Sequence, residues 1–167
     1  HYLTTVMRLR EGDAVALFNG RDGEWRAVFG REGRWECQLA VKNRTRAQAS
    51  ETDLWLLFAP VKRARLDFIA QKACEMGCSR IWPVRTDYTQ VTRVNNDRML
   101  ANVIEAAEQT ERLDIPEVIE FAPLEKALEA CGSERCLIFC DEVVAGDVLA
   151  NPVRVLGGAG SISSAAV

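Results

Sequence analysis

The feature that most constrains the fold is a change of sequence pattern near residue 50. Before it, short apolar or aromatic runs alternate with glycine-rich turns, which is typical of strands joined by hairpins. After it, apolar runs alternate with segments of helical periodicity, which is typical of a mostly parallel sheet covered by helices on both faces. The polar stretch 43–51 lies between the two patterns. We therefore expect an α/β protein with two domains, a small β-barrel over 1–50 and an α/β domain over 51–167.

The first part contains three runs that predict the strands of a meander, at 14–18, 25–29 and 35–41. Asn-Gly and paired glycines between such runs favour tight hairpins, and a spacing of about 8 to 12 residues suggests a small barrel. Arg8 and Arg10 stand beside the turn at 11–13. We expect them to present positive charge at the rim of the barrel.

The second part combines apolar runs, which predict strands, with three-to-four spacing, which predicts helices. The apolar face of the first helix comprises Leu66, Ile69, Ala70, Ala73 and Cys74, and Gly77 follows as its expected C-cap. The face of the second helix, over 96–110, comprises Leu100, Val103, Ile104 and Ala107. The other expected elements are strands at 54–60, 80–84, 118–121, 136–140 and 153–156, and a short helix that begins at Pro123 and runs to residue 130.

The composition is that of an ordinary globular protein, with 48% apolar and 27% charged residues in a chain of 167. These proportions exclude the disordered and membrane-spanning classes. No apolar run approaches the roughly 18 residues that cross a bilayer, and no secretory signal begins the chain, so we expect a cytoplasmic protein. His1 begins the chain abruptly and a tail rich in glycine and serine ends it, so we expect residues to be missing at either end or within this tail.

The six cysteines lie within apolar patterns, as in 72–78 and 136–140, where a thiol behaves as a small hydrophobe. We expect them to be reduced. The sequence has no C-x-x-C pair, and His1 is its only histidine, so it offers no ligand set for a structural zinc ion. We therefore expect no metal site.

The net charge is only −3, but its distribution is uneven. Residues 1–98 carry 17 Lys and Arg against 12 Asp and Glu, whereas residues 99–167 carry 4 against 12. A basic N-terminal part suits a polyanion such as RNA, because phosphate contacts supply much of the affinity for nucleic acid. A solvated surface explains the same charges equally well, so charge alone leaves both interpretations open.

Three features mark candidate sites without reference to any family. A glycine-rich turn at 156–160 follows an expected strand, where ligands of open α/β sheets bind, although a structural turn explains it at least as well. Asp141 and Glu142 follow the expected strand 136–140, where they either bind a ribose or an amine or cap a helix. One helix face groups polar residues that form either a site or a solvated surface with helix salt bridges. Its members are Glu105, Glu108, Gln109 and Arg112.

Five motifs stand in a characteristic order and spacing within residues 3–125. They are Leu57-Phe58-Ala59-Pro60-Val61-Lys62-Arg63, Gln71-Lys72-Ala73-Cys74-Glu75-Met76-Gly77, Ile81-Trp82-Pro83-Val84, Glu105-Ala106-Ala107-Glu108-Gln109-Thr110-Glu111-Arg112 and Ile115-Pro116-Glu117-Val118. With the opening segment 1–13, this set resembles the bacterial ribosomal RNA small subunit methyltransferase E family. The resemblance implies a PUA-like RNA-binding barrel followed by a SPOUT-class, trefoil-knotted α/β domain. It also implies a homodimer that binds S-adenosyl-L-methionine and methylates N3 of a uridine in the 16S ribosomal RNA of the small subunit.

The resemblance also implies a cofactor site, which the family builds from a strand end and a glycine-rich loop. The corresponding residues are Phe139, Asp141, Glu142, Leu156, Gly157 and Gly158. The Pro-Glu element of the family loop is missing here, which leaves open a catalytically decayed or truncated RNA-binding relative without methyl transfer. The later loop of the family is not recognisable, and Ala165-Ala166-Val167 is interpreted as the start of the last helix.

Methyl transfer to uracil N3 requires removal of its proton, in-line positioning and a positive side chain that stabilises the uracil oxyanion. Arg112 and Arg93 are the residues expected in that catalytic role. Many members of the family have an arginine at the position of Tyr88, so its role cannot be transferred to that residue, and Arg85 and Arg93 nearby are the alternative candidates for it. The expected RNA-binding cations are Arg8, Arg10, Lys62, Arg63, Arg65 and Lys72, although Lys72 is equally interpretable as a solvated helix residue. A nucleotide-binding α/β protein with no RNA role is the remaining alternative.

Overall fold

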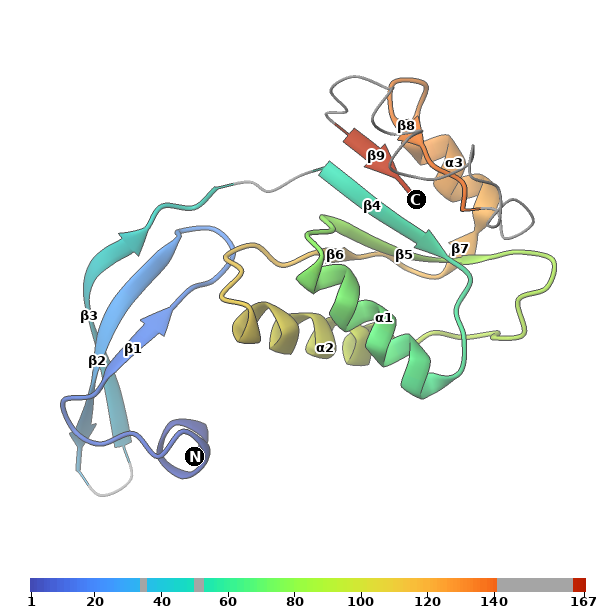
Figure 1. Ribbon diagram of the computed structural model, residues 1–167. Coiled ribbons are helices and arrows are strands. Elements are labelled where there is room, and N and C mark those ends of the chain that lie inside the picture. Colours follow the sequence, from blue (N-terminus) through green and yellow to red (C-terminus); the bar gives the residue numbers. More distant parts are fainter. Residues whose placement is uncertain (34–35, 50–52, 141–163) are drawn as a thin grey trace, which may run out of the picture. The chain divides into compact units, whose positions relative to one another are not determined.

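The computed structural model describes residues 1–33, 36–49, 53–140 and 164–167. The chain divides into two compact units, His1–Ser50 and Glu51–Val167, and each is described by itself (Figure 1). The first unit is built from antiparallel strands, and the second from a parallel sheet with helices on both faces. Within the described residues, no helix is both long enough and apolar enough to span a bilayer.

The first unit begins with a π-helical turn, η1 (Tyr2–Val6), which three strands follow. They are β1 (Ala14–Leu17), β2 (Glu24–Glu32) and β3 (Glu36–Arg46), paired antiparallel in the order β1-β2-β3. The expected meander is therefore confirmed. Ala27 and Phe29 are buried on one face of β2, which shows the alternation of a half-buried strand. In the part described, β1 and β3 are the edges of an open sheet.

The second unit is built on a sheet of parallel strands in the order β6-β5-β4-β9-β8. The strands are β4 (Asp53–Phe58), β5 (Arg80–Arg85), β6 (Glu117–Val118), β8 (Cys136–Leu137) and β9 (Ser164–Ala166), and β7 (Ala122–Pro123) also pairs with β5. The register of the two longest strands places Leu56 beside Ile81. The α/β class with a parallel sheet, expected from the alternation of apolar runs and helical segments, is confirmed.

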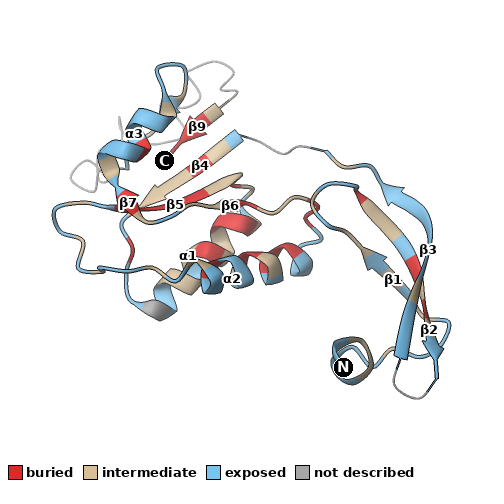
Figure 2. Ribbon diagram, turned by 180° about the vertical axis from the view of Figure 1, so that it is seen from behind, coloured by how far each residue is buried: buried red, intermediate tan, exposed pale blue. Residues whose placement is uncertain are grey.

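Helices cover both faces of this sheet (Figure 2). They are α1 (Arg63–Glu75) and α2 (Asn96–Gln109) on one face and α3 (Leu124–Cys131) on the other. Side chains alternate along β4 and β5, so each strand contributes to two cores. Leu56 and Ile81 pack with α1 and α2, whereas Trp55 and Trp82 pack with α3.

The ends of α1 and α2 follow from local sequence. The residue after Met76, the C-cap of α1, is Gly77, which has a φ of +89° that glycine adopts without strain. The N-cap of α2 is Asn95, whose side chain accepts the N–H of Arg98. The buried residues of α2 are Met99, Val103, Ala106 and Ala107. Leu100, expected on the buried face, is 40% exposed, so that part of the prediction is wrong.

The segment 165–167, expected to begin a helix, is instead part of β9 and the residue after it. Ala165 and Ala166 are buried, and β9 pairs in parallel with β4 on one side and β8 on the other. The prediction was wrong because pairing with two strands distant in sequence outweighs the local helix preference of alanine. The expected strand 153–156, and the segment that would form the expected knot, lie outside the described residues.

The amino ends of the central strands carry a stack of charged and aromatic groups. The Cζ atoms of Arg80 and Arg135 lie 3.9 and 3.8 Å from the ring centroid of Trp55, close enough for cation–π attraction. Arg135 also donates to the carbonyl oxygens of Asp53 and Ala165, at 2.9 and 3.1 Å. The stack therefore ties β9 to β4.

Candidate functional site

A cleft of about 800 Å³ lies where the carboxyl ends of β4 and β5 lead into α1 and α2. Loops from adjacent parallel strands meet at this edge of a sheet, and ligands of open α/β folds bind there. The polar lining residues are Lys62, Asp67, Arg93, Asn95 and Arg98, and apolar side chains including Leu66 and Met99 complete it. We therefore take this cleft as the candidate site of the second unit.

An ion pair between α1 and α2 fixes one wall of the cleft. Nε and Nη2 of Arg98 donate to the two carboxylate oxygens of Asp67, at 3.0 and 2.6 Å, and Asn102 donates to the same carboxylate at 2.9 Å. The hydrogen bond to Asp67 raises the pKa of Arg98 above its usual value, so the pair stays charged. These side chains hold one another and shape the cleft.

Two other cations of the lining, Lys62 and Arg93, are exposed and form no ion pair within the described residues. Lys62 directly precedes α1, and Arg93 lies in the loop between β5 and α2. Positive charge from two separate loops attracts an anion such as a phosphate or a developing oxyanion. The cleft can therefore bind an anionic group without first breaking an internal contact.

Arg93 also lines a neighbouring cleft of about 440 Å³, together with Asn95, Asn96 and Phe121. The Oδ1 atom of Asn96 is buried and has no hydrogen-bond partner in the part of the chain described. An unpartnered buried amide oxygen is costly unless a water molecule or a ligand donates to it. Arg93 therefore stands between two clefts and can reach a group in either.

The residues expected to hold a cofactor are only partly described. Phe139 lies just beyond β8 at the carboxyl edge of the sheet, and it is 84% exposed. The others, Asp141, Glu142, Leu156, Gly157 and Gly158, lie outside the described residues. The structure therefore places one of the six expected cofactor residues at the edge where ligand loops stand.

Arg112, expected to act in catalysis, is buried, with 6% exposure. Its Nη1 and Nη2 donate to the carbonyl oxygens of Cys74 and Cys78 at 2.6 and 2.7 Å, and its Nε and Nη2 donate to the carboxylate of Asp114 at 2.8 Å. The guanidinium thus holds the end of α1 and pairs with a neighbouring charge. The described contacts give Arg112 a structural part, because the side chain is enclosed and its donors are bound within the chain, and the expected catalytic role stays a prediction.

The expected RNA-binding cations are divided between the two units. Arg8 and Arg10 are exposed in the first unit. Lys62 and Arg65 are exposed in the second, whereas the side chain of Arg63 lies outside the description. Of these residues, the candidate cleft includes Lys62.

The polar residues expected along the helices mostly contact one another. Lys72 Nζ lies 2.6 Å from Glu75 and 5.6 Å from the ring centroid of Phe68, which favours the alternative that Lys72 is a helix surface residue. Gln109 donates to Glu105 at 3.3 Å, whereas Arg112 points into the core. The polar face of α2 is therefore a solvated surface with one internal hydrogen bond, as its alternative interpretation stated.

Sequence reasoning missed three residues that shape the cleft: Asp67, Asn95 and Arg98. A signal existed for Asn95, because asparagine immediately before a helical pattern is a typical N-cap. No local pattern joins Asp67 to Arg98, since they are 31 positions apart and meet only when α1 packs against α2. Long-range pairs of this kind require the packed structure.

Comparisons with known proteins place two family models on the chain. The model described as an RNA methyltransferase domain matches residues 48–157, and the model described as an RNA methyltransferase PUA domain matches residues 1–29. Ribosomal RNA small subunit methyltransferase E of Rickettsia conorii is 36% identical over 122 residues, which are 73% of this chain and 50% of the relative. The Synechocystis protein of the same name is 31% identical over 147 residues, 84% of this chain and 47% of the relative. The chain therefore spans about half the length of the curated relatives it matches.

Solved structures share the fold. Ribosomal RNA small subunit methyltransferase E of Neisseria gonorrhoeae, bound to S-adenosyl methionine, has a TM-score of 0.77 and 21% identity, over 99% of this chain and 68% of that chain. A structure from Legionella pneumophila, named for a methyltransferase in complex with the cofactor SAM, has a TM-score of 0.64 and 26% identity, over 83% and 60%. At 21% identity the first likeness concerns the fold alone.

Proposed function

The chain belongs to the RNA methyltransferase domain family, and on this premise we propose that the full-length protein transfers a methyl group from S-adenosyl-L-methionine to N3 of a uridine in 16S ribosomal RNA. The family match over residues 48–157 carries the proposal. Because the chain spans about half of its curated relatives, the cofactor, the ribosomal RNA of the small subunit and a homodimeric assembly are all parts of the proposal.

The cationic cleft supports this function by its chemistry. Removing the N3 proton of a uracil leaves negative charge on the ring, and a fixed positive group lowers the cost of that charge. Arg93 is the side chain assigned to this oxyanion, because it is exposed, lacks an ion pair in the described part and lies between two clefts. Lys62 is assigned to a phosphate of the same RNA segment.

One residue of the proposed cofactor site is described, and it suits a methyl donor with an adenine ring. Phe139 offers an exposed aromatic face at the carboxyl edge of β8, where an adenine can pack. S-adenosyl-L-methionine supplies an activated methyl group on sulfur when bound. Asp141 and Glu142 are proposed to bind its ribose or amine, and Leu156, Gly157 and Gly158 its remaining polar atoms through backbone groups.

A second candidate function is RNA binding without methyl transfer. It is favoured by one observation, since the stretch from Leu156 reads Leu-Gly-Gly-Ala-Gly and lacks the Pro-Glu element of the family loop. In that case the cationic surfaces still bind RNA, and no methyl donor is held.

The test uses the full-length protein and small ribosomal subunits that lack the modification. Isothermal calorimetry measures binding of S-adenosyl-L-methionine, and mass spectrometry of digested RNA measures formation of 3-methyluridine. Methyl transfer supports the proposal. RNA binding without cofactor binding supports the second candidate, and absence of both rejects each function.

A further inference from the structure

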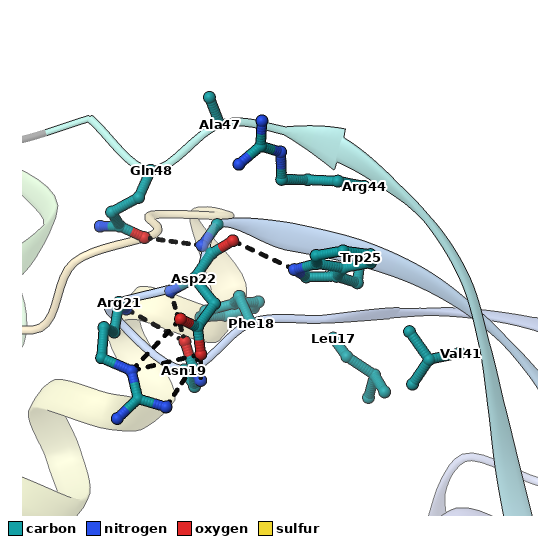
Figure 3. A pocket seen from close by; sticks show the side chains of 11 residues that line it. Leu17, Phe18, Asn19, Arg21, Asp22, Trp25, Val41, Arg44, Ala47 and Gln48 are labelled. Atoms are coloured by element: carbon teal, nitrogen blue, oxygen red, sulfur yellow. Dashed lines mark hydrogen bonds and ion pairs between the residues drawn. The ribbon is translucent and has the colours of Figure 1, made fainter.

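The first unit contains a cleft of about 630 Å³ that the proposed reaction does not use (Figure 3). Its floor is a row of residues across the sheet, since Leu17 pairs with Trp25 on one side and Trp25 pairs with Arg44 on the other. Directly opposed residues of neighbouring strands point to the same face. An aromatic ring and a guanidinium therefore share this face with the apolar side chain.

The aromatic part of the cleft is held in place. The indole Nε1 of Trp25 donates to the carbonyl oxygen of Asp22 at 3.0 Å, which fixes the ring relative to the turn before β2. The ring is only partly buried, and Phe18 lines the same cleft. A fixed, accessible indole offers a flat surface on which a planar group can stack at little entropic cost.

Of the charged residues that line the cleft, Arg21 and Asp22 pair with each other, and Arg44 is left to contact a ligand. The carboxylate of Asp22 accepts hydrogen bonds from Arg21 at 3.0 Å and from Asn19 at 2.7 Å, and these hold its pKa below the usual value. Arg44 forms no ion pair within the described residues. The cleft therefore combines a compensated acid with an unpaired guanidinium, which suits an anionic ligand.

The remaining wall adds an amide group. Gln48 Oε1 accepts the N–H of Gly23 at 3.2 Å, so its NH₂ group is left for other acceptors in the part described (Figure 3). Gly23 permits this wall, because a Cβ there would overlap the carbonyl oxygen of Arg46 and lie 2.8 Å from the backbone nitrogen of Gln48. An amide beside an aromatic face can bind the edge of a stacked base.

We propose that this cleft binds one nucleotide of single-stranded RNA, with its base stacked on Trp25, its phosphate held by Arg44 and its base edge bonded to Gln48. The inference rests on the proposed function and adds to it a second contact with the substrate RNA. Bases of a duplex are already stacked, so only an unpaired nucleotide can enter. The charge of the unit agrees, since residues 1–50 contain nine Lys and Arg against six Asp and Glu.

The test measures binding of the full chain to a fluorescein-labelled single-stranded RNA of mixed sequence, by anisotropy at several salt concentrations. Trp25→Leu is expected to weaken binding by about tenfold, since stacking on an aromatic ring contributes strongly to single-strand affinity. Arg44→Gln is expected to weaken it several-fold and to reduce the salt dependence by about one phosphate contact. Arg26→Gln removes the same charge from the opposite face of β2 and should change binding less than about twofold.

Trp25→Phe keeps an aromatic face and should retain binding, which separates lost stacking from lost folding. A duplex of the same sequence should compete poorly. The proposal is overturned by a chain that does not bind the single strand, by equal losses in Arg44→Gln and Arg26→Gln, or by unchanged affinity in Trp25→Leu. Failure of the proposed function has a different signature, namely Trp25-dependent RNA binding by a full-length protein that does not bind S-adenosyl-L-methionine.

Discussion

The clefts of the two units each contain one arginine that pairs with an aspartate and one that does not in the described part, but their other lining residues differ. In the first unit Arg44, which has no ion pair in the described part, shares its cleft with Trp25. In the second, Arg93 also has no ion pair in the described part, and it lies between a cleft whose described lining has no aromatic residue and a neighbouring cleft that includes Phe121. In each cleft another arginine pairs with an aspartate, Arg21 with Asp22 and Arg98 with Asp67. Within the described residues, the ion-paired arginines therefore form cleft walls, whereas Arg44 and Arg93 are left for the ligands proposed above. The difference suggests that one cleft selects a nucleotide and the other stabilises charge.

The largest expected effect tests whether paired arginines are structural. Arg112→Met removes the donors to the carbonyls of Cys74 and Cys78 and the counter-charge of Asp114. The free energy of unfolding should fall by about 3 kcal/mol, because breaking a buried ion pair leaves a charge uncompensated. Urea unfolding followed by circular dichroism measures this. Arg65→Met, at an exposed position of α1, is the control, and equal losses in both variants would contradict the assignment.

The next effect concerns the unpaired arginine of the second cleft. Arg93→Gln in the full-length protein should lower kcat for RNA methylation by about 100-fold, as removal of an oxyanion-stabilising donor does. Arg85→Gln, exposed at the end of β5 and outside the lining, should change kcat little. Trp25→Leu should instead raise KM with little change in kcat. A change confined to KM in Arg93→Gln would make that residue a binding contact and remove the difference between the clefts.

A smaller effect is expected from a substitution that distorts the cleft of the first unit and leaves the second unit unchanged. Gly23→Ala places a Cβ against the backbone of residues 46–48 at a φ of +82°, and should destabilise the first unit by about 2 kcal/mol. Hydrogen exchange of β2 and β3 amides measures the loss, and single-strand RNA binding should fall with it. Gly12→Ala is the control, because its φ of +92° gives the same backbone strain while no atom lies within 4 Å of the added Cβ. Equal effects at the two glycines would show that the close approach is unimportant.

The smallest effect is acid sensitivity of the second unit. The hydrogen bond from Arg135 holds the pKa of Asp53 below its usual value, so ionised Asp53 stabilises the folded state at neutral pH. This contribution is complete above the unfolded pKa, near about 4, and is lost as pH falls through the lowered folded pKa. Asp53→Asn should flatten the acid side of a stability profile by less than about 1 kcal/mol, because the carboxylate is half exposed. An Asp87→Asn control that flattens it equally would contradict this origin.

The local pattern of apolar residues predicted the order of helices and strands, but it did not predict every buried face correctly. Strands β4 and β5, and the C-terminal end of α1, lie close to where apolar runs and Gly77 placed them. The buried face of α2 differed, because Met99 and Leu100 are both apolar and periodicity cannot decide which one the sheet accepts. Ala165 and Ala166 were wrongly predicted to begin a helix. Their strand forms by pairing with two strands distant in sequence, which no local pattern indicates.

The candidate site was predictable only in part. Lys62 was expected because it lies in the motif 57–63, and Arg93 because it is near the position where the family has an arginine. The Asp67–Arg98 pair instead depends on packing between helices. Arg112 shows another limit, since spacing groups it with the polar face of α2, whereas its hydrogen bonds to two carbonyl oxygens hold it in the core. The pairing of Trp25 with Arg44 lies between two register shifts of β2 against β3. The alternation of apolar and polar residues does not predict such shifts, so it did not predict this pair.

The position of β9 has a consequence for how the chain reaches its native state. Residues 164–166 form the strand between β4 and β8, although both neighbours precede them in sequence. During synthesis, the edge of β4 that pairs with β9 therefore lacks this partner while more than a hundred further residues are added to the chain. Such an edge is a template for wrong partners. A chaperone that shields β4 at this stage is expected to raise the yield of native protein more than one that acts on the first unit.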